Sequence, residues 1–223
     1  MGSLHLVRHG QASFGAADYD QLSQRGAEQC RRLGAYWRER GQQFDAVFTG
    51  TLRRHAQSLA SLREGLDAEL PALALPGLNE YDSEALVRAV HPEPLAPPRD
   101  AEAVKQHFRL LRQGLLAWMR GETAPLGMPS FAGFSAGVAD ALQRVLDQGV
   151  GRQVLIVSSG GPISTAVAQV LAAPHETLVE LNLRMRNSAV TEFGFNARRH
   201  HLVTFNTLPH LDDEQGRRLI THA

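Results

Sequence analysis

Apolar runs and helical periodicities alternate along the N-terminal part of the chain. Residues 3–8 and 46–49 are short segments typical of buried strands, and a further short apolar run lies near 73–75. Between them, Ser23 can N-cap a helix with small and apolar residues at spacings of three and four, and a second helical segment covers about 52–62. This alternation predicts a largely parallel sheet with helices on both faces.

The middle of the chain, about residues 84–149, changes to a purely helical pattern. A proline-rich connector covers 91–98, and two helical stretches follow it. Their apolar residues recur at steps of three and four, as on the buried face of a helix. These residues are Val104, Phe108, Leu111, Leu115 and Trp118 in the first stretch and Val138, Leu142, Val145 and Leu146 in the second. We expect a helical insertion, able to serve as a lid, within a single domain of residues 1–223.

The strand pattern resumes after this insertion. A buried strand over 154–158 is followed by a Gly-rich turn and a helix from about Ser164, and a pair of antiparallel or edge strands is expected at 189–195 and 202–205. The whole pattern predicts an α/β fold with three α/β/α layers, a mostly parallel central sheet and a helical insertion.

Composition and charge narrow the classes of function. The 223 residues, 43% of them hydrophobic, can bury one substantial core. No apolar run approaches the roughly 18 residues of a membrane helix, and the start lacks a signal-peptide pattern, so we expect a cytoplasmic protein without a membrane partner. Basic and acidic residues number 23 each, which leaves no global field to attract nucleic acid. Cys30, on the apolar side of a helical pattern, is interpreted as a core residue rather than a nucleophile.

The strongest local signal is Arg8-His9-Gly10, which lies where the first predicted strand ends. In open α/β sheets ligands bind beyond the carboxyl ends of the strands, so these side chains are placed for chemistry. A neutral imidazole can attack phosphorus while a guanidinium group holds the phosphoryl oxygens in bidentate fashion. A three-residue match alone is common by chance. The same residues could be a histidine paired with backbone at the strand end and an arginine on the surface, with no catalytic role.

Two further strand ends carry related chemistry. After the second predicted strand, Gly50 leads into a helix with Arg54 in its first turn, and Ser159 and Gly160 lead into a later helix. Helix N-termini expose backbone N–H groups that bind anions. Three such junctions at one sheet edge converge on an anion, with phosphate as the leading candidate. His55, next to Arg54, is expected to line its helix outside the site.

These segments resemble the histidine phosphatase superfamily, the phosphoglycerate mutase-like proteins, over nearly the whole chain. The resemblance lies in motifs that follow the family's order along the chain. They are Leu6-Val7-Arg8-His9-Gly10, the helix opening over 22–29, the segment 52–58, Leu78-Asn79-Glu80, and the C-terminal segments 187–188 and 205–211. Agreement in order argues against coincidence.

The resemblance implies a phosphomonoester hydrolase that works through a phosphohistidine intermediate, without a metal or another cofactor. His9 is then the histidine that is phosphorylated, and Arg8 and Arg54 stabilise the phosphoryl oxygens. Glu80 stands at the position of the family's acidic proton donor, which protonates the leaving alkoxide and later activates water.

One segment departs from the family pattern. Where the family has Ser-His-Gly-Gly, this chain has Ser158-Ser159-Gly160-Gly161, so Ser159 stands at the position of the second histidine. We expect the Ser159 hydroxyl and the Gly160 amide on the phosphate wall. A hydroxyl cannot carry the positive charge of a protonated imidazole, and charge-assisted hydrogen bonds are the stronger ones, so turnover is expected to be slow.

No other histidine is an obvious replacement. His5 lies one strand position out of phase with the pocket edge, residues 200–201 are expected in a turn, and His210 lies outside the catalytic set. It stays open whether His91 or His107 of the insertion reaches the site.

Other classes of function fit less well. A serine hydrolase built on Ser159 would need a Gly-x-Ser-x-Gly elbow, and the residue two before Ser159 is Val157. No nucleotide-binding fingerprint follows a strand, and the histidines lack the paired helical spacing of a metal site. A weakly active or inactive family member that binds phosphorylated ligands or a protein partner stays open, although binding alone would not need His9 and Glu80.

Between hydrolysis and a phosphoglycerate-type mutase reaction, the sequence favours hydrolysis. The acidic residues within 81–84 would repel a carboxylate-bearing sugar phosphate, and no additional basic pair is visible there. We expect a small phosphorylated substrate. Sugar phosphates, nucleotides, phosphoproteins and small alcohol phosphates all stay open, as does a homodimer.

Overall fold

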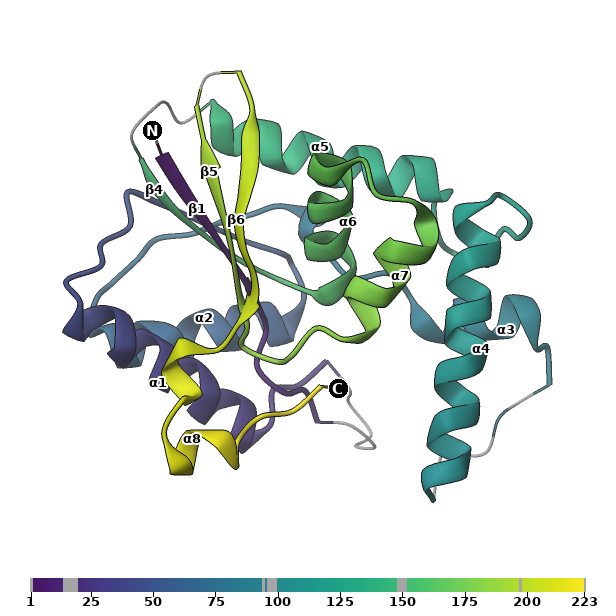
Figure 1. Ribbon diagram of the computed structural model, residues 1–223, viewed down its shortest axis with the longest axis horizontal. Helices are drawn as coiled ribbons and strands as arrows, with labels where there is room; N and C mark the ends of the chain where they lie inside the picture. The colour runs from purple at the N-terminus through teal and green to yellow at the C-terminus, as the bar shows by residue number, and fades with distance from the viewer. Residues whose placement is uncertain are drawn as a thin grey trace.

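One six-stranded sheet forms the centre of the computed structural model, which describes residues 2–13, 20–93, 95, 100–147, 152–196 and 198–222. The strands are β1 (Gly2–Arg8), β2 (Ala46–Thr49), β3 (Leu73–Ala74), β4 (Gln153–Ser158), β5 (Val190–Phe195) and β6 (His200–Thr207). Their order is β3-β2-β4-β1-β5-β6 (Figure 1). The first four strands are parallel, whereas β5 runs antiparallel to β1 and β6 antiparallel to β5. This confirms the predicted mostly parallel sheet with an antiparallel pair at one edge.

Helices connect and cover these strands. They are α1 (Gln24–Glu39), α2 (Arg53–Leu66), α3 (Ser83–Val90), α4 (Ala101–Met119), α5 (Phe131–Leu146), α6 (Gly160–Leu171), α7 (His175–Leu183) and α8 (Glu214–Arg217), with short 3-10 turns η1 (Pro76–Leu78) and η2 (Pro209–Leu211). Within the described part of the chain, no helix combines the length and the apolar character needed to cross a membrane.

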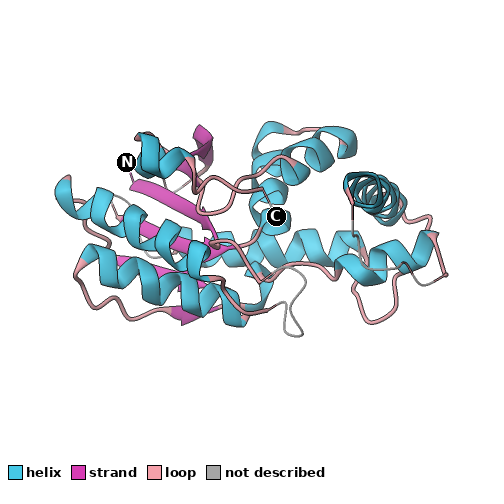
Figure 2. Ribbon diagram, turned by 90° about the horizontal axis from the view of Figure 1, so that it is seen from below, coloured by secondary structure: helices cyan, strands magenta, loops and turns pink. Residues whose placement is uncertain are grey.

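Alternate residues of the strands face two separate apolar cores. In β4, Val154 and Ile156 pack with α5 and α6, while Leu155 and Val157 pack with α1 and α2. Figures 1 and 2 show these two helix pairs on opposite faces of the sheet. Because both faces are buried, the strand is apolar at consecutive positions, and the three-layer α/β/α fold is confirmed. Cys30 lies in the second core, where burial raises the pKa of its thiol to about 11.

The helices of the expected insertion take part in a third apolar cluster beside the sheet. Leu86 of α3 and Leu115 and Trp118 of α4 pack there with Val179 of α7. Figure 1 shows α3 and α4 at the side of the sheet on which α7 lies. The indole N–H of Trp118 donates to the carbonyl oxygen of Pro129 at 3.0 Å, which fixes the loop before α5. Part of the proline-rich connector expected at 91–98 lies outside the described residues.

Two local predictions were wrong. The helix expected from Ser164 begins at Gly160. Pro162 does not prevent this, because backbone N–H groups in the first turn of a helix have no partner inside the helix, and proline only removes such a group. His200 and His201 belong to β6 rather than to a turn, since both pair with the end of β5.

The strand register brings three strand ends together. Arg8 of β1 pairs with Ser158 of β4, and Thr49 of β2 pairs with Val157 of β4. The chain therefore leaves three neighbouring parallel strands at one edge, where ligands of open α/β sheets bind. The residues that follow these strands are His9, Gly50 and Ser159.

Candidate active site

His9 follows β1 and is nearly closed to solvent, with 3% of its surface exposed. Its Nδ1 atom lies 2.7 Å from the carbonyl oxygen of Gly10. Because a carbonyl oxygen only accepts hydrogen bonds, Nδ1 carries the proton and Nε2 keeps its lone pair. Burial, and after it the charges of Arg8 and Arg54, hold the pKa of His9 well below its usual value. The imidazole is therefore neutral and available as a nucleophile near neutral pH.

The turn after His9 is fixed from both sides. The backbone N–H of His9 donates to the carbonyl of Ser158 at 2.8 Å, and the N–H of Gly10 donates to the Ser58 hydroxyl of α2 at 3.0 Å. A Cβ at Gly10 would lie 2.3 Å from the carbonyl oxygen of Gly26, so only glycine permits this close approach to α1. The orientation of the imidazole is thus set by backbone contacts.

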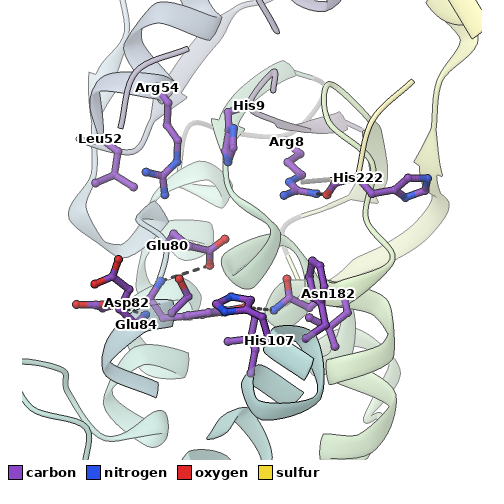
Figure 3. A pocket seen from close by; sticks show the side chains of 15 residues that line it. Arg8, His9, Leu52, Arg54, Glu80, Asp82, Glu84, His107, Asn182 and His222 are labelled. Carbon is purple, nitrogen blue, oxygen red and sulfur yellow. Dashed lines mark hydrogen bonds between the residues drawn. The ribbon is translucent and has the colours of Figure 1, made fainter. Parts of the chain in front are cut away.

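Arg8 is held by segments that are remote in the sequence. Its Nη1 atom donates to the carbonyl oxygens of Met185 and His222, the latter at 2.7 Å. The segment that carries His222 is tied to α1, where the Gln29 amide donates to the carbonyl of Leu219 at 2.7 Å. Figure 3 shows Arg8 beside His9, with the dashed contact to His222. These carbonyl contacts position the guanidinium group at the end of β1.

Arg54, in the first turn of α2, is also buried and paired. Its side chain is 8% exposed, and its Nη1 atom lies 2.7 Å from Oδ1 of Asp20. The same carboxylate accepts the backbone N–H of Arg53 at 2.8 Å, so it also satisfies a donor at the helix start. Asp20 was not predicted as a site residue, because no motif connects it with the start of α2.

Glu80 follows η1 and faces the arginines. Its Oε1 atom accepts hydrogen bonds from the backbone N–H groups of Gly161, at 3.0 Å, and Tyr81, at 3.3 Å. Burial raises the pKa of Glu80, against the opposing effects of Arg54, the Gly161 N–H and Arg8. The carboxyl group therefore keeps its proton to a higher pH than an exposed glutamic acid, as a general acid requires.

These four side chains line one cavity of about 520 Å³. In Figure 3, His9 lies between Arg8 and Arg54, and Glu80 lies across the cavity from them. The structure therefore brings together the four residues expected to carry the chemistry. The opposite end of the cavity is lined by residues of α7, α4 and the start of α3, including Asp82, Ser83, Glu84, His107, Phe108, Leu111 and Asn182.

A histidine of the expected insertion does reach this cavity. His107 of α4 lines it, and its ring lies edge-on to Phe108 with ring centroids 6.0 Å apart. The Nδ1 atom of His91 is instead 2.9 Å from the carbonyl oxygen of Glu93, and His91 is not among the described lining residues. Over the described ranges, no three or more His, Cys, Asp and Glu side chains are grouped so that they could hold a metal ion.

Ser159 and Gly160 lie behind the described cavity lining. Ser159 is fully buried and is not among the described lining residues, and its Oγ atom is 2.6 Å from Nε2 of His55. The short side chain turns toward α2 instead. At Gly160 a Cβ would lie 2.7 Å from Oδ1 of Asn182. Phosphate binding by the Ser159 hydroxyl and the Gly160 amide stays a prediction.

His55 is a close neighbour of the nucleophile that was expected to lie outside the site. It is fully buried, and its ring centroid is 5.7 Å from that of His9. A signal for this placement exists in the sequence: His55, Leu59, Leu62 and Leu66 recur at helical spacing, and all four are buried. This periodicity places His55 on the core face of α2, pointing toward the end of β1.

Comparisons with known proteins agree with this architecture. A family model described as histidine phosphatase superfamily (branch 1) matches residues 4–208. The chain is 30% identical over 208 residues to a 2,3-bisphosphoglycerate-dependent phosphoglycerate mutase of Methylobacterium radiotolerans, covering 87% of this chain and 90% of the relative. Its fold is similar to that of phosphoserine phosphatase from Entamoeba histolytica in complex with 3-phosphoglyceric acid (TM-score 0.66, 20% identity, 95% of this chain and 100% of the other). It is also similar to the alpha-ribazole phosphatase from Shigella flexneri (TM-score 0.63, 22% identity, 92% and 96%).

Proposed function

The chain belongs to the histidine phosphatase superfamily (branch 1), and on that premise we propose that it hydrolyses phosphomonoesters through a phosphohistidine intermediate on His9. One observation carries the proposal. The buried, neutral imidazole has its Nδ1 proton held by Gly10, which leaves the unprotonated Nε2 for the cavity between Arg8 and Arg54. A nucleophile with a fixed tautomer between two guanidinium groups is suited to phosphoryl transfer.

The first step transfers the phosphoryl group to the protein. The Nε2 lone pair of His9 attacks phosphorus, and the bond from phosphorus to the ester oxygen breaks. Arg8 and Arg54 stabilise the charge on the equatorial oxygens. Glu80 donates its proton to the departing alkoxide oxygen, so the product leaves as a neutral alcohol.

The second step returns His9 to its starting form. Water attacks the phosphorus of the phosphohistidine, the Glu80 carboxylate takes a proton from that water, and the phosphorus–nitrogen bond breaks. Inorganic phosphate leaves, and the imidazole is again neutral with its proton on Nδ1. The same carboxyl group thus serves as acid in one step and base in the next.

The charge distribution in the cavity supports hydrolysis over a mutase reaction. Among its described lining residues, the arginines are Arg8 and Arg54, both at the phosphoryl end, whereas Asp82 and Glu84 lie at the other. A substrate with its own carboxylate would meet like charge at that end. An uncharged or cationic leaving group fits the cavity better.

Phosphate release from an aryl phosphate tests the proposal. We expect the native protein to hydrolyse it and His9→Ala to lose at least about 1,000-fold in kcat, because the nucleophile is absent. His201→Ala, a histidine replacement on β6 outside the described cavity lining, is the matched control and should keep native activity. Equal rates for the native protein and His9→Ala would overturn the assignment.

Two other outcomes identify the rival functions. A native protein that binds vanadate through Arg8 and Arg54 but releases no phosphate would be an inactive, ligand-binding member of the family. Isomerisation of 3-phosphoglycerate faster than its hydrolysis would identify a mutase. Either result contradicts the proposed hydrolase.

A further inference from the structure

His55 and Ser159 form a buried pair beside the nucleophile, and the two chemical steps above leave both unused. The Nε2 atom of His55 lies 2.6 Å from Oγ of Ser159, and neither residue exposes any surface. The His55 ring also lies beside that of His9, with centroids 5.7 Å apart. The pair thus links α2 to the turn before α6 next to the reacting imidazole.

The space for the His55 ring is built into the fold. A Cβ at Gly50 would lie 2.2 Å from Nδ1 of His55, so the chain after β2 must be glycine for the ring to fit. The ring is enclosed between this glycine, Ser159 and His9. Such close confinement gives the imidazole one orientation.

The proton of the His55 imidazole can be assigned from its surroundings. Burial, and after it the charge of Arg54, lower the pKa of His55 to about 3, so the ring is neutral and has one N–H. Its Nδ1 atom is buried and has no hydrogen-bond partner among the described residues. A buried N–H without an acceptor is rarer and costlier than a bare acceptor, so the proton belongs on Nε2. Nε2–H therefore donates to Ser159 Oγ.

This assignment leaves the hydrogen of the Ser159 hydroxyl for another acceptor. Ser159 is the N-cap residue of α6, yet its side chain makes no capping hydrogen bond, and His55 is the partner found for Oγ within the described structure. The preceding residue, Ser158, pairs with Arg8 in the sheet, so Ser159 stands next to the strand end that carries His9. A phosphoryl oxygen bound at His9 would supply that acceptor.

We propose that His55 is a positioning residue for phosphoryl transfer: its Nε2–H holds Ser159 Oγ so that the serine hydroxyl donates to a phosphoryl oxygen at His9. The chain of donors, from imidazole to hydroxyl to phosphoryl oxygen, polarises the hydroxyl and makes it a better donor. The inference rests on the proposed function. Ser159 exposes no surface, so we expect the contact to form only with a phosphoryl group bound closely at His9, and to affect the transition state more than substrate binding.

Two replacements of similar size separate the donor from the bulk of the ring. His55→Gln keeps an N–H donor near the place of Nε2, whereas His55→Leu fills the space without one. With Ser159 present, we expect His55→Leu to lower kcat roughly 5- to 10-fold with KM unchanged, and His55→Gln to stay near native. Vanadate, which adopts the five-coordinate geometry of the transfer, should bind correspondingly more weakly to His55→Leu.

The Ser159→Ala background shows whether His55 acts through the hydroxyl. There we expect the Gln and Leu variants to have the same kcat, because the residue that links His55 to the phosphoryl group is gone. Equal kcat values for Gln and Leu with Ser159 present, or an undiminished difference between them with Ser159→Ala, would overturn the proposal. If His55→Leu does not fold, Ser159→Ala alone decides: a kcat equal to native overturns the proposal, and a lowered kcat at unchanged KM supports it.

The result also separates this inference from the proposed function. If His9→Ala abolishes the activity but the replacements of His55 and Ser159 leave it unchanged, only the positioning role is wrong. If the native protein and His9→Ala bind vanadate equally and release no phosphate, the hydrolase proposal itself fails, and the positioning role fails with it.

Discussion

The two ends of the cavity are built in opposite ways. At the phosphoryl end, His9 and Arg54 are nearly closed to solvent and fixed by Gly10 and Asp20. At the far end, Phe108 on α4 is 37% exposed, and the side chain of Glu84 is 82% exposed. One end comes from strand ends and the helix starts that follow them, and the other from helices outside the sheet.

This difference separates the chemistry from the choice of substrate. A phosphoryl group is the same in every phosphomonoester, so its binding groups can be buried and immobile. Leaving groups differ, and an exposed helical wall can change its side chains without disturbing the sheet. Replacements at the phosphoryl end should therefore lower kcat for every substrate, whereas replacements at the far end should change KM for some substrates.

Arg54→Gln should reduce activity on every substrate, whereas the losses from replacing Glu80 or Phe108 should depend on the leaving group. Removing one charged donor to the phosphoryl oxygens typically lowers kcat by about 100- to 1,000-fold, and we expect a similar loss with aryl and alkyl phosphates alike. Arg53→Gln, at the exposed neighbouring position, is the control and should stay within about 2-fold of native. Steady-state rates on a series of phosphomonoesters measure both. A loss confined to one class of leaving group would contradict the separation of the two ends.

The loss of activity in Glu80→Gln should depend on the basicity of the leaving group and on pH. General acid catalysis contributes about 100- to 10,000-fold, so we expect a loss in that range for alkyl phosphates and a far smaller one for aryl phosphates with acidic phenols. Burial raises the pKa of Glu80, so the native protein keeps the acid protonated to higher pH and loses activity on alkyl phosphates as pH rises through that pKa.

Single-turnover release of the leaving group isolates this first step. Glu80→Gln cannot titrate, so it should lack the alkaline decline. The same fold-loss for aryl and alkyl substrates would remove Glu80 from the role of proton donor.

Phe108→Ala should have the smallest effect and the most selective one. Losing the apolar contact should raise KM a few-fold for substrates with aromatic or alkyl leaving groups, because such contacts contribute about 1–3 kcal/mol to the binding free energy. KM for a small polar phosphate, and kcat for both, should stay near native. Val104→Ala, at an equally exposed site on α4, should change neither parameter. A fall in kcat common to all substrates would mean that α4 takes part in the chemistry.

The placement of the main residues could be predicted because it depends on strand ends. Arg8 ends the first strand, His9 follows it, and Arg54 lies just beyond the second, so the parallel sheet alone brings them to one edge. Glu80 was expected there through the resemblance, and it does face the arginines. The roles of these residues stay predictions until their variants are measured.

Other contacts could not be predicted because they depend on side-chain packing between distant segments. Ser159 was expected on the cavity wall, and nothing in the sequence indicated that its Oγ atom pairs with Nε2 of His55. The pairing of Asp20 with Arg54 and the contact of the His222 carbonyl with Arg8 join segments that share no periodicity. Hydrophobic patterns carry no information about such polar contacts between segments.

The contact between Arg8 and the His222 carbonyl has a consequence for how the protein folds. It joins residues 214 positions apart, and β1, which carries Arg8, also pairs with β5 from Gly2 to Phe195. The phosphoryl site therefore combines segments from near both ends of the described chain. A partly folded chain in which these segments have not met has a phosphoryl site that is not yet assembled.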